Sequence, residues 1–144
     1  MFKKARGLTR AIYTAFATCK DYGFRDQIQR ASVSVISNIA EGFESGTKQE
    51  FLNYLYIAKA SAGEVRAQLY VAHDIGYLNI EMFKHLNTSA EECSRLIASF
   101  AKKLKAGGMS GSQFKRETRD LAGEMLSAAG YMRLPNGQVV EKQI

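Results

Sequence analysis

Residues 50–72 decide the fold, and they read EFLNYLYIAKASAGEVRAQLYVA. Because an α-helix turns once every ~3.6 residues, apolar residues that alternate between steps of four and three lie on one face of a helix. The stretch keeps this alternation over its whole length, which is typical of a helix packed at a shallow angle against neighbouring helices. The positions of this seam are Phe51, Leu55, Ala58, Ala62, Val65, Leu69 and Ala72.

Start and stop signals bracket this predicted helix. Thr47 and Glu50 form a Thr-x-x-Glu capping box, whose side chains can satisfy two backbone amides at a helix start. Gly76 predicts the end, since glycine readily adopts the left-handed conformation that follows a helix. Asn79 predicts the cap of the next helix, over residues 79–105. Its seam consists of Phe83, Leu86, Ala90, Cys93, Ile97, Phe100 and Leu104.

Two more helices are predicted upstream. The first carries the stripe Leu8, Ile12, Ala15 and Cys19, and Gly23 predicts its end. The second, residues 28–43, is apolar on nearly all sides, so we expect it to be the most enclosed element. Short loops allow only antiparallel neighbours. The sequence therefore predicts an all-α fold, an antiparallel up-down-up-down four-helix bundle over residues 1–106.

Residues 107–144 are predicted to form a C-terminal extension. Glycine and serine dominate residues 106–113, as in a flexible linker. A weaker helix follows, ending at Gly130, and Pro135 with Gly137 predicts a turn between short extended pieces at 131–134 and 138–140. A lone hairpin is marginal in water. We therefore expect the extension to be partly disordered unless it packs against the bundle or a partner.

The 144 residues carry 20 Lys and Arg against 14 Asp and Glu, a net charge of +6, which favours polyanionic partners. No apolar run approaches the ~20 residues of a membrane span, and the N-terminal residues lack the apolar core of an export signal. Two cysteines without a CxxC pattern predict neither a zinc site nor a disulfide framework. We expect a cytoplasmic protein that contacts no membrane.

Catalytic and cofactor motifs are missing from the sequence. His73 and Asp74, with Glu64, could be read as a metal or acid–base cluster, but a histidine in the last turn of a helix more often interacts with the helix dipole. We therefore expect no enzyme, metal or cofactor. Exposed tyrosines can stack on bases, but at helical spacing they are more often core or interface residues, as we expect for Tyr54, Tyr56, Tyr70 and Tyr77.

Basic residues concentrate near both ends of the predicted bundle. The first helix is antiparallel to the fourth, so we expect their basic side chains to gather in one rim that contacts phosphates by charge alone. The alternative is that the lysines only complement the helix dipole and keep the surface soluble. Lys48 and Lys59 are weaker candidates, as is Arg66. The expected rim consists of Lys3, Lys4, Arg6, Arg10, Lys102, Lys103 and Lys105.

Residues 24–43, FRDQIQRASVSVISNIAEGF, closely resemble the signature of a four-helix-bundle family, the S23 or 23S rRNA intervening-sequence proteins. The resemblance continues through residues 50–61, 64–69 and 76–78 and covers roughly residues 8–105. It implies a small non-enzymatic bundle whose relatives form closed homopentamers with a basic channel. The family is also distantly similar to the accessory variability protein of diversity-generating retroelements, which binds nucleic acid and a reverse transcriptase.

The resemblance also assigns roles to single residues. Ser37, Asn38, Glu41 and Gly42 match the most recognisable stretch and are expected to be structural. Arg25, Gln27 and Arg30 match positions that could face nucleic acid or a neighbouring subunit. One departure is Ile36, which stands where the family commonly has proline.

Together these observations predict a homo-oligomer, a pentamer by resemblance, that binds RNA or DNA non-specifically. It would be an accessory to a ribonucleoprotein or to a reverse transcriptase. The alternative is a protein–protein adaptor whose C-terminal extension, residues 109–144, docks a partner.

Overall fold

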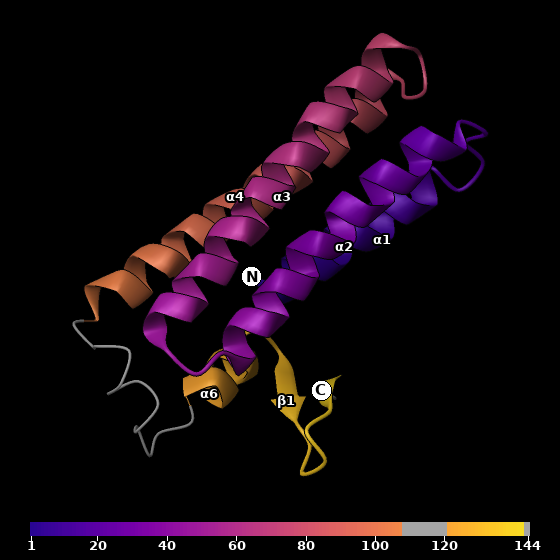
Figure 1. Cartoon of the computed structure of the whole chain (residues 1–144). Helices are drawn as coiled ribbons and strands as arrows, with labels where there is room; N and C mark the ends of the chain where they lie inside the picture. Colours follow the sequence, from indigo (N-terminus) through magenta and orange to yellow (C-terminus); the bar gives the residue numbers. More distant parts are fainter. Residues whose placement is uncertain (108–120, 143–144) are drawn as a thin grey trace.

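The structure is a computed structural model that describes residues 1–107 and 121–142. Four long helices lie side by side, and a short extension covers one end of them (Figure 1). Neighbouring helices contact one another along the chain, and α1 also contacts α4, which closes the bundle. The predicted fold class is confirmed. The helices are α1 (Phe2–Ala15), α2 (Tyr22–Glu44), α3 (Lys48–Asp74) and α4 (Ile80–Ala106).

The predicted boundaries of α3 and α4 are confirmed to within a residue or two. The hydroxyl of Thr47 accepts a hydrogen bond from the backbone N–H of Glu50 at 3.1 Å, and the Glu50 carboxylate accepts one from the N–H of Gly46 at 3.2 Å. Asn79 caps α4 by accepting from the N–H of Met82 at 2.8 Å. After α3, Gly76 has a φ of 85°, the left-handed conformation that glycine adopts without strain.

The predicted end of the first helix was wrong. Helix α1 ends at Ala15, so Cys19 lies outside it, and Gly23 lies in the first turn of α2. The start of α2 is set by Asp21, whose carboxylate accepts a hydrogen bond from the N–H of Phe24 at 3.2 Å. An N-capping aspartate is thus a stronger local signal than a nearby glycine. As a result α1 has 14 residues and runs along only part of the 27-residue α4.

One continuous apolar core joins the four helices, and it contains both predicted seams. Helix α2 is not the most enclosed element, however. It buries seven residues against nine for α3, and its outer face exposes Arg30, Val33, Ser37 and Glu41. We expected apolar residues on nearly all sides of α2. One side of the helix is instead exposed to solvent.

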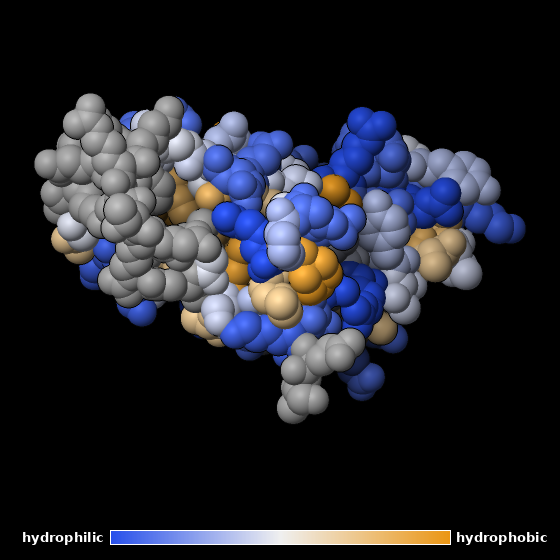
Figure 2. Space-filling view, turned by 90° about the horizontal axis from the view of Figure 1, so that it is seen from below, coloured by the Kyte–Doolittle hydropathy of each residue, from blue (hydrophilic) through white to orange (hydrophobic). Residues whose placement is uncertain are grey.

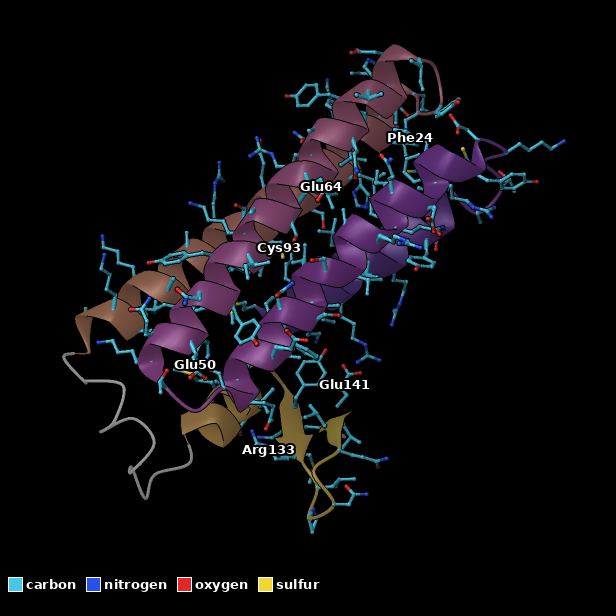
Figure 3. The ribbon with its side chains drawn as sticks, viewed as in Figure 1. Phe24, Glu50, Glu64, Cys93, Arg133 and Glu141 are labelled. Carbon is cyan, nitrogen blue, oxygen red and sulfur yellow. The ribbon has the colours of Figure 1, made fainter. Side chains whose placement is uncertain are left out.

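The C-terminal extension packs against its own bundle. It consists of α6 (Leu121–Ala128) and a hairpin of β1 (Tyr131–Arg133) and β2 (Val139–Glu141), paired antiparallel with Tyr131 opposite Glu141. Tyr131 is only 2% exposed, and its ring meets the ring of Phe2 edge-on at a centroid distance of 4.8 Å. The guanidinium of Arg133 forms a 3.0 Å ion pair with Glu44 at the end of α2 (Figure 3).

The extension confirms the predicted turn between extended pieces, and its hairpin contacts α1 and α2. The predicted linker and the start of the predicted helix, residues 108–120, lie outside the described residues. Seen from this end of the molecule, the surface is mostly hydrophilic and has an apolar patch near its middle (Figure 2). None of the helices in the described ranges is long and apolar enough to cross a bilayer.

Candidate functional site

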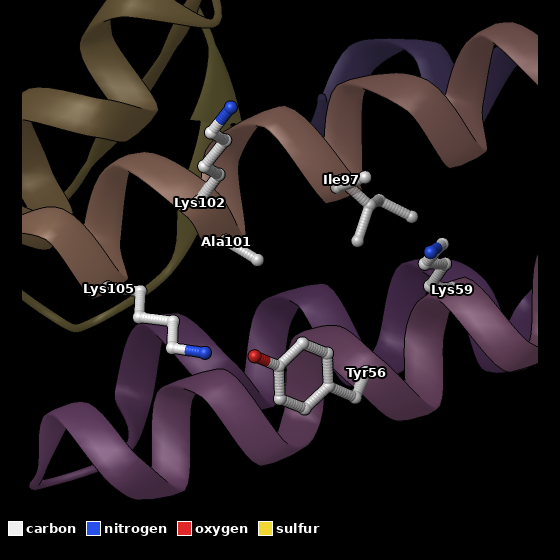
Figure 4. Close-up of a pocket in the computed structure, with 7 residues that line it drawn as sticks. Tyr56, Lys59, Ile97, Ala101, Lys102 and Lys105 are labelled. Carbon is white, nitrogen blue, oxygen red and sulfur yellow. The ribbon is translucent and has the colours of Figure 1, made fainter.

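A groove between α3 and α4 brings lysine side chains together near the end of α4 (Figure 4). It has a volume of about 250 Å³. Two of its lysines were predicted as binding residues, and a third comes from α3. We call this feature the lysine groove; it is lined by Tyr56, Lys59, Ile97, Ala98, Ala101, Lys102 and Lys105.

The antiparallel packing of α3 and α4 explains how the lysine groove forms. The short turn at residues 75–79 reverses the chain, so the first half of α3 lies beside the second half of α4. The ammonium group of Lys48, at the start of α3, donates a hydrogen bond to the backbone carbonyl of Lys105 at 3.1 Å. Lys48 therefore adds a further positive charge next to the groove, within the last turn of α4.

The lining combines positive charge with an apolar floor. Ile97 is 1% exposed and is followed on α4 by two small alanines, whereas Tyr56 is 48% exposed. Among the described residues, no acidic side chain lines the groove, and none forms an ion pair with its three lysines. Like charges held close together repel one another, so the groove is suited to an anionic partner.

The structure does not bring the basic residues of α1 to this groove, and the single predicted rim was wrong. Lys4 forms an ion pair with Glu92 in the middle of α4. Because a helix rises ~1.5 Å per residue, that contact lies about 15 Å along α4 from Lys102. Arg6 is turned toward the extension, where its guanidinium lies 3.4 Å from a carboxylate oxygen of Glu141. Lys3 and Arg10 are exposed on α1.

The predicted basic residues of α2 are also distant from the groove in sequence and have local partners. Arg30 forms a 3.0 Å ion pair with Asp26 one turn earlier. The guanidinium of Arg25 donates to the carbonyl of Cys19 at 3.5 Å and lies 4.8 Å from the centre of the Tyr22 ring. Acidic side chains therefore neutralise part of the predicted set. Lys103 is exposed in the last turn of α4, beside the two lysines that line the groove.

The four family-signature residues divide between the two sides of α2. Gly42 is buried, and a Cβ atom there would lie 3.3 Å from both Phe51 and Tyr54 of α3, so the glycine permits the close approach that we expected. The Asn38 amide donates to the carbonyl of Ser34 at 2.8 Å. The polar contact continues to α3, because the hydroxyl of Ser34 on α2 forms a hydrogen bond with the hydroxyl of Ser61 on α3, at 2.8 Å between the two oxygens.

Ser37 and Glu41, the other two signature residues, are exposed on the outer face of α2. The structural role expected of these two residues is therefore not explained by packing within this chain. The sequence pattern alone did not distinguish the two pairs, because all four residues lie within six positions of one another.

His73, considered above for a metal or acid–base cluster that we did not expect, makes local contacts at the end of α3. Nδ1 of His73 lies 3.3 Å from the carbonyl oxygen of Leu78, and its ring stacks on Phe83 at a centroid distance of 5.2 Å. Neighbouring Asp74 is exposed. Within residues 1–107 and 121–142, no group of three or more His, Cys, Asp or Glu side chains could hold a metal ion.

Three of the tyrosines expected in a core or interface are exposed to solvent in the single chain. Tyr56, Tyr70 and Tyr77 are 48%, 51% and 41% exposed. The hydroxyl of Tyr77 donates a 2.6 Å hydrogen bond to Asp21, which lowers the pKa of that carboxyl group. Tyr70 packs edge-on against Phe83. Tyr56 is the tyrosine that lines the lysine groove, and residue spacing alone did not reveal this.

Comparison with known proteins identifies the family. The sequence profile of the 23S rRNA-intervening sequence protein matches residues 1–99. A solved structure from Bacteroides thetaiotaomicron, of a protein with unknown function from the S23 ribosomal protein family, superimposes with a TM-score of 0.67 at 25% identity. It covers 70% of this chain and 97% of its own. None of the curated proteins matches this chain. The profile and the bundle together show that the chain belongs to the 23S rRNA-intervening sequence protein family.

Proposed function

We propose that this protein is a non-enzymatic, oligomeric bundle that binds RNA or DNA through the lysine groove. The observation that carries the proposal is the set of lysines from two helices around one hollow, without an acidic partner among the described residues. Phosphates of a nucleic-acid backbone supply the missing negative charge. Such contacts position a strand without reading its sequence. The resemblance to retroelement and rRNA-linked relatives makes a ribonucleoprotein or a reverse transcriptase the setting we propose.

The helix dipole does not explain all of these lysines. Lys103 and Lys105 lie in the last turn of α4, where a positive charge is favourable whatever the function. Lys48 begins α3, where the dipole is itself positive, but its ammonium group donates a hydrogen bond to the Lys105 carbonyl and so stabilises the C-terminal end of α4. Lys59 lies in the first half of α3, away from both ends of the helix, and lines the groove. Local helix stability therefore does not explain Lys59, which favours a ligand.

An exposed strip on α3 supports the oligomeric part of the proposal. Its residues follow steps of three and four, the spacing of a packing seam, and they are exposed in the single chain. Apart from one glutamate, the side chains are apolar or small, which is unusual for a solvent-facing helix. We call this the outer strip of α3; it consists of Ile57, Ala60, Glu64, Ala67 and Val71. A second copy that packed there would bury it, and the family resemblance suggests five copies.

A salt series tests the binding proposal. Fluorescence anisotropy with a labelled RNA of arbitrary sequence should show binding at low salt, and log Kd should rise linearly with log salt concentration. The double variant Lys59→Glu/Lys105→Glu should weaken binding at least tenfold and reduce the salt slope. The matched control is Lys20→Glu/Lys84→Glu, which makes the same charge change at exposed positions outside the groove. Equal losses in both variants, or no binding by the wild type, would contradict the proposal.

The second candidate function is that of a protein–protein adaptor, and a different observation supports it. The hairpin of the extension exposes the apolar side chains of Met132, Val139 and Val140 at 43%, 39% and 36%. A partner could pack against these side chains without displacing the buried Tyr131. Under this alternative, removing the charges of the lysine groove leaves partner binding unchanged, whereas Met132→Asp/Val140→Asp abolishes it.

A further inference from the structure

We infer that the lysine groove takes an unpaired nucleobase, so that the protein binds single-stranded nucleic acid in preference to a duplex. This inference rests on the proposed function and names the kind of strand that the groove accepts. It depends on three features of the lining: an exposed aromatic ring, an apolar floor, and lysines at the edge.

The ring is Tyr56, which is 48% exposed although it stands beside the packed seam of α3. In Figure 4 its hydroxyl and the ammonium end of Lys105 extend toward each other from the two helices, while Lys102 extends away from the ring. Among the described residues, the Tyr56 side chain forms no hydrogen bond and no ring contact with another aromatic residue. About half of the residue is therefore accessible to a ligand.

The floor of the groove is apolar and shallow. Ala98 and Ala101 are one turn apart on α4 and carry only methyl groups, which leaves a hollow beside Ile97. The volume of about 250 Å³ falls below the ~300 Å³ at which pockets for drug-sized molecules begin. Phosphate groups would gain nothing from such a floor, because burying a charge on apolar atoms is costly.

Each chemical part of a nucleotide therefore has a partner in the groove. The base would stack on Tyr56 over the alanines, and the flanking phosphates would meet Lys59 and Lys105. A duplex keeps its bases stacked inside, so only its phosphates reach the lysines. The lining residues include no amide, carboxylate or guanidinium side chain. Because the lysines would be engaged by phosphates and every base has a face that can stack on Tyr56, we expect little preference for one base over another.

The experiment compares three labelled probes of equal length by fluorescence anisotropy: oligo-dT, a duplex, and an abasic strand that keeps the phosphates. Wild-type protein should bind oligo-dT at least fivefold more tightly than either of the others. Tyr56→Leu should lower affinity for oligo-dT by roughly 5- to 150-fold, the effect of removing one base–aromatic stack. It should leave duplex binding and the salt slope unchanged, and Tyr56→Phe should keep the wild-type affinity.

Tyr70→Leu is the matched control, because Tyr70 is 51% exposed on the same helix, two heptads further along and outside the groove. Circular dichroism melts of each variant check that the bundle is intact. Equal binding of abasic and normal strands, or an equal loss from Tyr56→Leu and Tyr70→Leu, would overturn the inference while the phosphate proposal survived. Absence of binding by every probe at low salt would overturn both.

Discussion

Cys93 lies in the middle of α4 with no exposed surface, and burial raises the pKa of its thiol to about 11 (Figure 3). In an unfolded chain the thiol titrates near ~8.5, so the folded protein binds this proton more tightly. The contribution of the neutral thiol to the free energy of unfolding is therefore fully present below about pH 8.5 and is lost as the pH rises toward 11. The expected decrease in the free energy of unfolding is ~3 kcal/mol at most.

Urea unfolding of the wild type and Cys93→Ala at pH 8 and pH 10.5 measures this effect. Lysines and tyrosines titrate in both proteins and cancel in the comparison. The wild type should lose more free energy of unfolding than the variant between the two pH values. Parallel pH dependence in the two proteins would show that the thiol is not protected by burial.

Gly42 lies where α2 packs closely against α3. A Cβ atom there would meet Phe51 and Tyr54 at 3.3 Å, and Phe51 is itself 1% exposed and unable to move aside freely. Gly42→Leu should therefore lower the free energy of unfolding by about 1–3 kcal/mol, as overpacking of a core does. Gly7→Ala is the control, because nothing lies within 4 Å of the added methyl group in α1, and it should stabilise by ~0.5–1 kcal/mol.

The bounds of helices α3 and α4 could be predicted because the residues that start and end each helix act only on their neighbours in the chain. Thr47 and Asn79 cap the helices that directly follow them, and Gly76 ends the helix before it. The prediction for α1 failed because the Cys19 position fits the helical spacing by chance, while Asp21 acts on α2. Packing of the extension depends on contacts such as Arg6 with Glu141, 135 residues apart, and no local signal encodes these.

Tyr131 provides a buried aromatic contact between the extension and the bundle. Its ring is 2% exposed against Phe2, and its hydroxyl lies 3.4 Å from a guanidinium nitrogen of Arg6. We expect Tyr131→Ala to raise hydrogen exchange throughout residues 121–142 at least tenfold, since removing a buried aromatic ring costs ~3–5 kcal/mol of packing. Exchange in α2 and α3 should change little.

Met132→Ala provides the comparison for the extension, because Met132 is the next residue in β1 and is 43% exposed. It should leave exchange in residues 121–142 near the wild-type level. If Tyr131→Ala also left exchange unchanged, contacts other than this ring would hold the extension, such as the ion pair of Arg133 with Glu44.

The lysine groove was only half predictable from the sequence, for a reason that concerns the whole molecule. Charge counting found Lys102 and Lys105 because they cluster in the chain. Lys59 and Tyr56 are isolated in the sequence and join them only because α3 is antiparallel to α4. The error for α1 came from placing its N-terminus level with the C-terminus of α4. A shorter α1 places Lys4 beside Glu92 instead, where its charge is neutralised.

Oligomer formation concerns the molecule as a whole, and it can be tested by a substitution in the outer strip of α3. Ala67 is exposed in this strip, one turn from Glu64, so Ala67→Glu should change the stability of a lone subunit by no more than ~0.5 kcal/mol. In an assembled protein the same change would place a second charge in an apolar contact, beside a like charge. Size-exclusion chromatography with light scattering should show the wild type as an oligomer at micromolar concentration and the variant as a single subunit. Thr88→Glu, at an exposed position of α4, should leave the mass of the assembly unchanged.

Assembly also bears on binding, because joined subunits present several lysine grooves to one strand. Linked sites can gain a factor of ~10²–10⁴ in affinity without any new contact. Ala67→Glu should therefore weaken binding to a long RNA far more than binding to an oligonucleotide that spans one groove. A wild type that scatters light as a lone subunit would remove the assembly from the proposal. Equal losses on long and short probes would show that the grooves act one at a time.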